Sequence, residues 1–340
     1  MRRLLGIGGA HVDRRGQVGG DHVPAASNPG TMREEVGGGA LNALRSAAQR
    51  GVACTLISVR GGDAAGEAVA RAVAEAGISD LSVTFLDRAT ASYTALIDRH
   101  GELITGLADM GLYDLAFPKQ MRRSSVREAV AQAHAVLCDA NVPEAGLTRI
   151  AALAAGQPLF AIGVSPAKVT RLAGILPDLT CAFLNRREAA TLARHFSEQI
   201  PPPLTPPHKG EGDSGTSPPS PPPPWEEGSG VGVIDRLRKA GLRSAVVTAG
   251  GEAVVAFDAD GVFRLTPPAP RGVADVTGAG DALAGAAIAA LLAGRPLGAA
   301  LREGVAASIL AIESPAAVPD LSGPAFEAAL RRVPEPQPVE

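Results

Sequence analysis

The segment best suited to chemistry is a run of small residues that ends in one acid and leads into an apolar helix. Residues 272–281 read Gly-Val-Ala-Asp-Val-Thr-Gly-Ala-Gly-Asp. The backbone amides of Gly278, Ala279 and Gly280 can face an anion closely, at the positive end of the predicted helix. Asp281, in the first turn, could take a proton from a hydroxyl that attacks phosphorus. The alternative interpretation is an ordinary helix cap after a glycine turn.

Two further polar features follow a predicted strand or begin a predicted helix, where ligands bind in open parallel sheets. Asp13 follows the first strand and could accept hydrogen bonds from two neighbouring hydroxyls of a sugar. Gly38 allows close backbone approach, and Asn42 on the next helical turn can both donate and accept. The alternative interpretation is a turn role for Asp13 and ordinary helix capping for the Gly and Asn residues.

The segment Asn185-Arg-Arg-Glu188 lies at a predicted strand-to-helix junction. A structural interpretation is that Asn185 caps the helix and Glu188 completes a capping-box pair. The functional alternative is that both residues order a hydrated Mg²⁺ beside a triphosphate.

Composition and missing motifs exclude several functional classes. There is no GxxxxGK[ST] sequence and only four lysines, which excludes a P-loop, and no protein-kinase motif set is present. The net charge of −3 and the absence of a basic run give no indication of nucleic acid binding. No apolar run is long enough to predict a membrane span. Three widely spaced cysteines form no disulfide framework, which favours a reducing, cytoplasmic location.

Alternating strand and helix patterns predict an α/β protein with a mostly parallel sheet. Residues 14–36 and two predicted strands, 81–86 and 91–98, are candidates for a small accessory sheet. Eleven of the 28 prolines fall between Pro201 and Pro224. We therefore predict a disordered, proline-rich insert over residues 199–229, because this composition buries too little apolar area to order the chain.

Taken in order, these motifs resemble those of the ribokinase-like, phosphofructokinase-B-type sugar and nucleoside kinases. The matching segments are Gly37-Gly38-x-x-x-Asn42, Asn185-x-x-Glu188, Thr248-Ala-Gly250-Gly251 and Asp275-Val-Thr277-Gly278-Ala279-Gly280-Asp281. The resemblance covers the chain outside the insert. It implies a three-layer α/β/α sandwich within residues 1–330, a small β lid from about 14–36 and 82–108, and a tail at 331–340.

The resemblance also implies roles for individual residues. Asp281 would be the catalytic base, and Gly278, Ala279 and Gly280 the anion hole over the γ-phosphate of ATP. Asp13, Gly38, Asn42, Asn141 and Lys168 would bind the substrate. Asn185, Glu188, Thr248, Gly250 and Gly251 would bind the nucleotide, with Glu188 ordering Mg²⁺ through water. Asp275 and Thr277 would form a site for a monovalent cation such as K⁺.

Within this family the chain is most similar to the pseudouridine kinases. The residues that carry this similarity include Ser27-Asn-Pro-Gly30, Ser92-Tyr-Thr-Ala95, Asp139-Ala-Asn141 and Ser165-Pro-Ala-Lys168. The expected reaction is phosphorylation of the 5′-hydroxyl of pseudouridine. One alternative is a kinase that phosphorylates another nucleoside or a free sugar. The other alternative is a protein that binds a nucleoside without catalysis. A homodimer through the lid is a further expectation.

Overall fold

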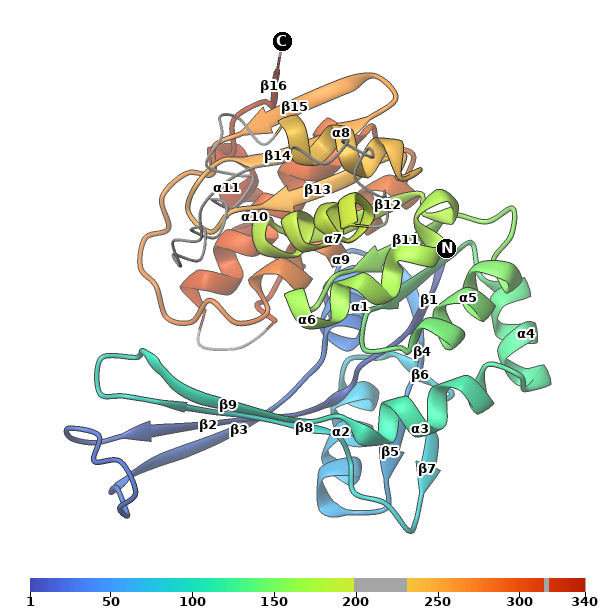
Figure 1. Cartoon of the computed structure of the whole chain (residues 1–340). Helices are drawn as coiled ribbons and strands as arrows, with labels where there is room; N and C mark the ends of the chain where they lie inside the picture. The colour runs from blue at the N-terminus through green and yellow to red at the C-terminus, as the bar shows by residue number, and fades with distance from the viewer. Residues whose placement is uncertain (199–230, 315–317, 340) are drawn as a thin grey trace, which may run out of the picture.

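The centre of the molecule is a large twisted sheet (Figure 1). The computed structural model describes residues 1–198, 231–314 and 318–339, and within them this sheet has ten strands in the order β16-β15-β14-β13-β12-β11-β10-β1-β4-β6. The pairs from β6 to β13 are parallel, whereas β13 to β16 pair antiparallel. The strands are β1 (Arg3–Ile7), β4 (Ala53–Ile57), β6 (Ser79–Asp80), β10 (Ala135–Asp139), β11 (Leu159–Ile162), β12 (Cys181–Asn185), β13 (Ala245–Thr248), β14 (Val254–Asp258), β15 (Gly261–Leu265) and β16 (Gln337–Pro338).

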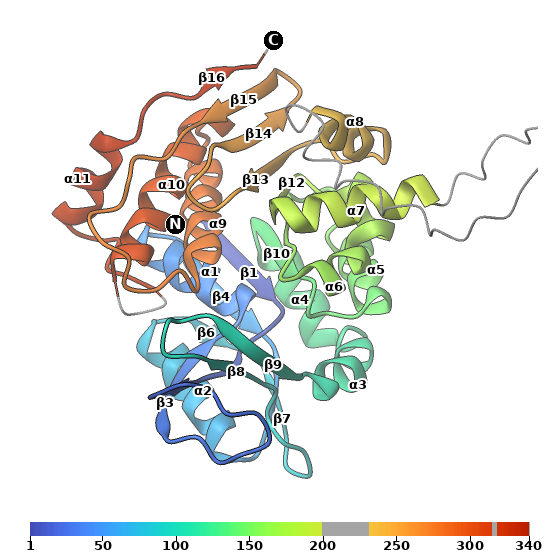
Figure 2. The same ribbon diagram turned by 60° about the vertical axis from the view of Figure 1, so that its left-hand side comes forward.

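Helices cover both faces of this sheet, as Figure 2 shows. One apolar cluster packs the first face against α1 (Gly39–Gln49), α2 (Ala64–Glu75), α9 (Ala279–Leu292), α10 (Leu297–Glu313) and α11 (Pro324–Arg332). A second cluster packs the other face against α3 (Gly111–Gln120), α4 (Ser124–Gln132), α5 (Glu144–Leu153), α6 (Pro166–Val169) with the 3₁₀ helix Thr170–Asp178, α7 (Arg186–Glu198) and α8 (Val231–Lys239). The predicted three-layer α/β/α sandwich is therefore confirmed.

A second sheet extends from the body, at the lower left of Figure 1. It consists of β2 (His11–Val18), β3 (Gly30–Gly37), β8 (Ser92–Ile97) and β9 (Leu103–Asp109), in the order β3-β2-β8-β9. We call these four strands the lid. Because β2 follows β1 after only three residues, the lid begins next to the carboxyl end of the central sheet.

Two boundaries expected from the sequence are wrong. Residues 83–85 do not join the lid, because β7 (Val83–Phe85) pairs with β5 (Val59–Gly61) in a separate parallel pair. Residues 331–340 are not a simple tail, because Arg331 and Arg332 end α11 and β16 adds to the central sheet. The insert predicted over residues 199–229 lies outside the described residues. Helix α3 has no expected counterpart in the sequence analysis.

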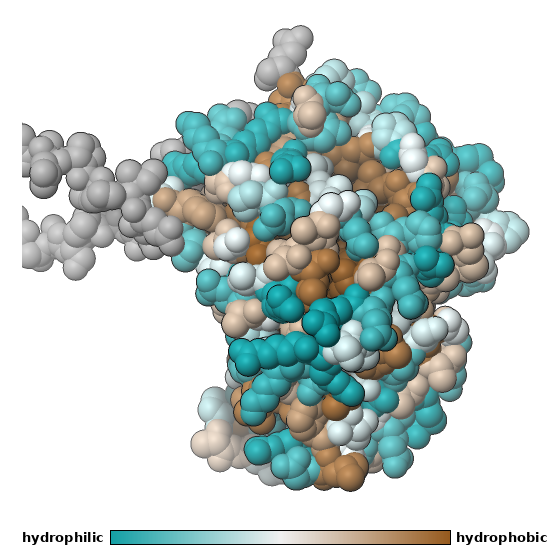
Figure 3. Space-filling model, turned by 90° about the vertical axis from the view of Figure 1, so that its right-hand side faces the viewer, coloured by the Kyte–Doolittle hydropathy of each residue, from teal (hydrophilic) through white to brown (hydrophobic). Residues whose placement is uncertain are grey.

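The surface is mixed in character. On the face drawn in Figure 3, hydrophilic and hydrophobic residues are interspersed. Cys54, Cys138 and Cys181 are all buried with free thiols. No helix in the described part of the chain is long and apolar enough to cross a membrane.

Candidate active site

The carboxyl ends of the parallel strands gather the polar residues. Asp139, Asn185 and Thr248 are each the last residue of a strand, in β10, β12 and β13. Because β1 and β10 to β13 are parallel, these ends lie along one edge of the sheet. The amino end of α9 and the start of the lid meet at the same edge, so the fold brings most of the expected site residues together there (Figure 1).

Helix α9 begins as the small-residue motif predicts. Gly278 is its N-cap, with a left-handed φ of 77°, which favours glycine. Among the described residues, the amides of Gly278 and Gly280 have no hydrogen-bond acceptor, and that of Ala279 has only a long bond of 3.4 Å to Val276 O. Nothing lies within 4 Å of where a Cβ on Gly280 would stand. The turn therefore has backbone donors without an acceptor in the described chain and open space beside Gly280, and both features suit an anion site.

Asp281 lies in the first turn of α9 and is held from one side. Asn42 Nδ2 donates to Asp281 Oδ2 at 3.1 Å. Within the described residues, Oδ1 receives no hydrogen bond. Burial raises the pKa of Asp281 to about 7, the Asn42 hydrogen bond opposes this, and the nearby carboxylates of Asp139, Asp13 and Glu188 add to it. A carboxylate with one unpaired oxygen and this pKa can act as a general base near neutral pH.

The approach of α1 to α9 makes the Asn42–Asp281 contact possible. Gly285 lies one turn after Asp281, and a Cβ there would stand 2.2 Å from Ala43 O of α1. The two helix backbones therefore touch at a position where any side chain would separate them. The role of Gly285 could not be predicted from the sequence, because a glycine within an apolar helix carries no local sign of what it contacts.

The residues expected to bind a sugar lie on the lid and in the turn before α1. Asp13 on β2 is half-buried, and His11 Nε2 lies 3.3 Å from Asp13 Oδ1. A Cβ on Gly37 would stand 2.1 Å from Asp13 Oδ2, so a glycine is needed beside this carboxylate. Gly38 has a φ of 112°, and its Cβ would stand 2.4 Å from Gly9 O. Both glycines thus let the start of α1 approach Asp13.

A buried carboxylate, Asp139, organises the centre of the site. It accepts hydrogen bonds from Gly9 N at 2.9 Å, Ala40 N at 3.0 Å, and both the backbone and side-chain amides of Asn141. Asp139 was not among the expected site residues, although its position at a strand end in Asp-x-Asn was the available signal. It fixes β1 and α1 to β10, and so sets where Asn42 points.

Asn141 contacts the Asp139 carboxylate, and Lys168 in turn contacts Asn141. Lys168 Nζ donates to Asn141 Oδ1 at 2.7 Å, and Asn141 Nδ2 donates to Asp139. Burial lowers the pKa of Lys168, although the negative charge of Asp139 opposes this. Asn141 is buried and has protein partners at both ends of its amide. Its contacts suit positioning of Asp139 better than direct substrate contact.

Asn185 and Glu188 form the reciprocal pair that a capping box requires. Glu188 N donates to Asn185 Oδ1 at 2.9 Å, and Asn185 N donates to Glu188 Oε2 at 2.8 Å. Burial raises the pKa of Glu188 to about 7, against the hydrogen bonds from Asn185. The same side chains line a cavity of about 160 Å³ that also reaches Gly280 and Asp281. The structural and functional interpretations are therefore compatible.

A larger apolar cavity adjoins this one. It has a volume of about 470 Å³ and is lined by Thr248, Gly250, Gly251, the segment Pro267-Pro-Ala-Pro270, and apolar residues of α9 and α10. Thr248 and Gly280 line both cavities. One ligand could therefore occupy both cavities, with a flat apolar group in the larger one and a chain of phosphates that passes Thr248 to the start of α9.

Asp275 and Thr277, in the loop before α9, contact the lid. Arg15 Nη1 lies 2.5 Å from Asp275 Oδ2, and Arg15 Nη2 donates to Thr277 Oγ1. Thr277 N donates to the other oxygen of Asp275 at 2.8 Å. The role of Arg15 could not be predicted from the sequence, because a single arginine in a polar segment has no distinctive local pattern.

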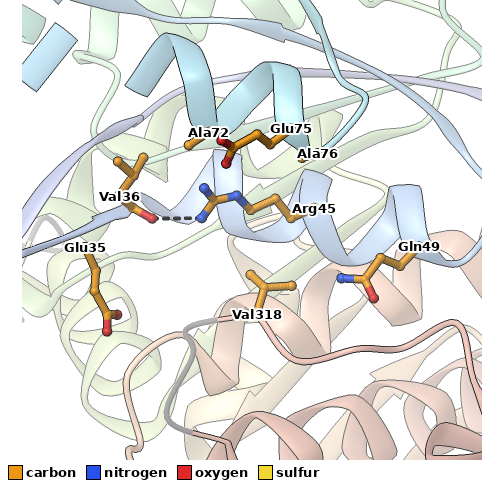
Figure 4. Close-up of a pocket in the computed structure, with 8 residues that line it drawn as sticks. All are labelled: Glu35, Val36, Arg45, Gln49, Ala72, Glu75, Ala76 and Val318. Carbon is orange, nitrogen blue, oxygen red and sulfur yellow. Dashed lines mark hydrogen bonds between the residues drawn. The ribbon is translucent and has the colours of Figure 1, made fainter. Parts of the chain in front are cut away.

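A separate cavity of about 640 Å³ lies behind α1, and Figure 4 shows Arg45 pointing into it. Its lining is Glu35, Val36, Arg45, Gln49, Ala72, Glu75, Ala76 and Val318. Arg45 Nη1 donates to Val36 O at 2.8 Å and to Asn42 Oδ1 at 3.3 Å. Asp281 does not line this cavity. The cavity matters to the site only through Arg45, which holds the side chain of Asn42.

The family assignment agrees with this geometry. The model of the pfkB family of carbohydrate kinases matches residues 1–322. The chain belongs to the pfkB family. It is therefore a ribokinase-like carbohydrate or nucleoside kinase, which transfers a phosphoryl group to an alcohol of its substrate.

Individual relatives support the assignment over the full length. A solved carbohydrate kinase from Agrobacterium tumefaciens is 40% identical, with a TM-score of 0.80 and full coverage of both chains. The pseudouridine kinase of Escherichia coli (strain K12) is 26% identical over 307 residues, which are 90% of this pfkB-family chain and 89% of the relative. A ribokinase from Arabidopsis thaliana, solved with ribose and ATP, is 18% identical with a TM-score of 0.77, covers 97% of this chain and 99% of its own, and so shows a shared fold.

Proposed function

We propose that this kinase phosphorylates the 5′-hydroxyl of a nucleoside with ATP as donor, and that the nucleoside is pseudouridine. The observation that supports this most directly is the arrangement around Asp281. Asn42 holds one carboxylate oxygen, and the other has no donor among the described residues. That oxygen lies at the start of a helix where, among the described residues, the amides of Gly278 and Gly280 have no hydrogen-bond acceptor. A base and an anion site side by side are what phosphoryl transfer to a hydroxyl needs.

The proposed step assigns one action to each group. Asp281 takes the proton of the 5′-hydroxyl as that oxygen bonds to the γ-phosphorus, and the bond to the oxygen shared with the β-phosphate breaks. The amides of Gly278, Ala279 and Gly280 donate to the γ-phosphoryl oxygens, where negative charge accumulates. Asp13 and Gly38 bind the sugar, while Thr248, Gly250 and Gly251 bind the nucleotide. Asn42, which was expected to bind the substrate, instead holds Asp281 in place, because its buried amide has protein partners at both ends. ADP and the nucleoside 5′-phosphate are the products.

Mg²⁺ fits the cavity between the base and the nucleotide side. Its polar lining includes the oxygen donors of Asn185, Glu188 and Asp281, which suit a hard cation. No group of three or more His, Cys, Asp or Glu side chains in the described ranges could hold a metal by itself. This agrees with an ion held mainly by phosphates and water, with Glu188 and Asn185 as outer contacts. When bound, the ion would neutralise charge on the phosphates.

The substrate is tested by comparing nucleosides and sugars. Full-length protein with ATP and Mg²⁺ is incubated with pseudouridine, uridine, adenosine or ribose, and ADP release is followed. We expect the highest kcat/KM for pseudouridine, because the similarity to the E. coli pseudouridine kinase spans nearly the whole chain. A higher value for ribose or another nucleoside would refute pseudouridine but leave the kinase assignment intact. Binding of pseudouridine without turnover would contradict the proposed base and anion hole.

We also propose that the outer face of the lid binds a second copy of the chain. Met32, Leu96 and Leu107 are 57%, 38% and 70% exposed, and Met32 and Leu96 lie together over Gly16. Asp13 and Arg15 point to the opposite face of β2, because side chains alternate along a strand. Three exposed apolar side chains on one small sheet favour a protein contact.

The dimer is tested with Leu107→Asp, which should shift sedimentation from dimer to monomer at micromolar concentration. Leu86→Asp is the matched control, because Leu86 is 89% exposed and lies outside the lid. A wild-type protein that sediments as a monomer at all concentrations would contradict the dimer.

A further inference from the structure

The loop before the anion hole is tied to the lid by one arginine. Arg15 lies on β2, and its guanidinium contacts the carboxylate of Asp275 and the hydroxyl of Thr277. Asp275 and Thr277 lie 260 and 262 positions after Arg15 in the chain. Thr277 directly precedes Gly278, so the arginine holds the residue that sets the path of the first anion-hole amide.

The contacts use the oxygens that a bound cation would need. Asp275 Oδ2 faces Arg15, Asp275 Oδ1 accepts from Thr277 N, and Thr277 Oγ1 accepts from Arg15. A monovalent cation at these side chains would have to displace a positively charged guanidinium. The side chains as arranged therefore do not fit the cation site that the family resemblance implies.

The charges in the surrounding cavity agree with a paired arginine. Burial alone would raise the pKa of Asp275, but the hydrogen bonds from Thr277 and Arg15 outweigh it and hold this pKa below its usual range. The carboxylate therefore stays ionised. A cavity of about 130 Å³ between the lid and this loop is lined by three arginines, Arg14, Arg15 and Arg33, and by three carboxylates, Asp13, Glu35 and Asp275. Of these arginines, Arg15 is the one that contacts Asp275.

Asp13 and Arg15 share one face of β2 because they are two residues apart. In the proposed function Asp13 binds the sugar. Arg15 contacts Asp275 and Thr277, in the loop before α9. One rigid strand thus sets the distance between the two halves of the site.

We propose that the Arg15 guanidinium is a built-in cation that positions Asp275, Thr277 and hence the anion hole, so that catalysis needs no monovalent cation. Arg15 is a positioning residue, because it acts through the loop. The proposal rests on the kinase function described above. The positive charge beside Asp275 and Thr277 then comes from a side chain of the lid and not from a dissociable ion. The conformation of the loop that contains Asp275 and Thr277 therefore depends on the position of the lid.

The test compares cations at equal ionic strength. Wild-type enzyme is assayed with ATP, Mg²⁺ and nucleoside in choline, sodium or potassium chloride, and its Tm is measured in the same salts. We expect kcat and Tm to be the same in all three salts. Activation by K⁺ of severalfold, or a Tm raised by K⁺ alone, would overturn the proposal.

Variants of Arg15 provide the second arm. Arg15→Gln should lose about 10–100-fold in kcat, as for other residues that orient a reactive group from behind. Added K⁺ or guanidinium ion should restore part of this loss and raise the Tm of the variant but not of the wild type. Arg15→Lys should keep more activity than Arg15→Gln, because it retains the charge without the forked geometry. Arg99→Gln, which removes another lid arginine paired with Asp21, is the control expected to behave as wild type.

The outcomes separate the two proposals. An Arg15→Gln enzyme as active as wild type in choline would overturn the role of Arg15 while leaving the kinase function intact. If no nucleoside or sugar is phosphorylated, the proposed function fails, and the Tm measurements still decide whether Arg15 replaces a cation. Should Arg15→Gln not fold, the salt series on the wild type and Arg15→Lys decides the matter.

Discussion

Asp281→Asn is expected to lower kcat by about 10²–10⁴-fold, the usual cost of removing a general base. The amide keeps the shape of the side chain and can still contact Asn42, so KM for both substrates should change little. ADP release in the presence of pseudouridine measures the effect. Asp260→Asn, an identical change in the exposed β14–β15 turn at the opposite edge of the sheet, should keep wild-type activity. A fully active Asp281→Asn enzyme would rule out Asp281 as the base.

The raised pKa of Asp281 gives the same variant two pH signatures. Wild-type kcat/KM should fall about tenfold per pH unit below pH 7, because the base must be deprotonated and its pKa is raised to about 7. The residual activity of Asp281→Asn should lack this limb. A wild-type profile that is flat from pH 5 to pH 8 would contradict the raised pKa.

Stability should change in the opposite direction to activity. The pKa of Asp281 is raised from 3.8 in the unfolded reference to about 7, so the folded protein binds the proton more tightly. The free energy of unfolding that depends on this group is then highest at low pH and falls as pH rises from about 4 to about 7. Asp281→Asn removes this loss, so ligand-free protein should gain stability at pH 8, by at most about 4 kcal/mol for a shift of about three pKa units. Denaturant unfolding of both proteins at pH 5 and pH 8 checks the sign.

Asp13→Ala is expected to raise KM for the nucleoside by about 10²–10⁴-fold, because two hydrogen bonds to a charged acceptor together contribute about 3–6 kcal/mol. kcat should fall less, since Asp13 lies on the sugar side and binds the ground state and the transition state alike. Asp21→Ala, at the tip of the β2–β3 hairpin, is the matched control. Steady-state kinetics with pseudouridine as the varied substrate measures both parameters.

A substrate analogue shows whether Asp13 binds the vicinal hydroxyls. Wild-type enzyme should discriminate strongly against 2′-deoxypseudouridine, because Asp13 then loses one donor. Asp13→Ala should lose most of this discrimination, since the partner of the missing hydroxyl is already absent. Equal discrimination in both enzymes would place the hydroxyls elsewhere.

The features that could be predicted from the sequence are those that depend on residues close together in the chain. Small residues before an apolar helix predict the turn at Gly278 and the position of Asp281, because both depend on neighbours in the chain. The alternating pattern predicts parallel strands, and parallel strands bring Asn185 and Thr248 to one edge of the sheet. The reciprocal hydrogen bonds of Asn185 and Glu188 follow from their spacing of three. Helix α3 was missed because Pro118 interrupts its pattern.

What the sequence determined alone is therefore the family, the layered fold and the motif that carries the base, since each is specified over a few consecutive residues. Only the tertiary structure decided which distant groups meet. Asn42 contacts Asp281 across 239 positions, and Arg15 contacts Asp275 across 260. No local pattern records such pairs, because they arise when Gly285 lets two helices touch and when one strand carries the lid over the start of α9. The pKa of Asp281 belongs to the same class, since burial and three carboxylates from separate elements set it.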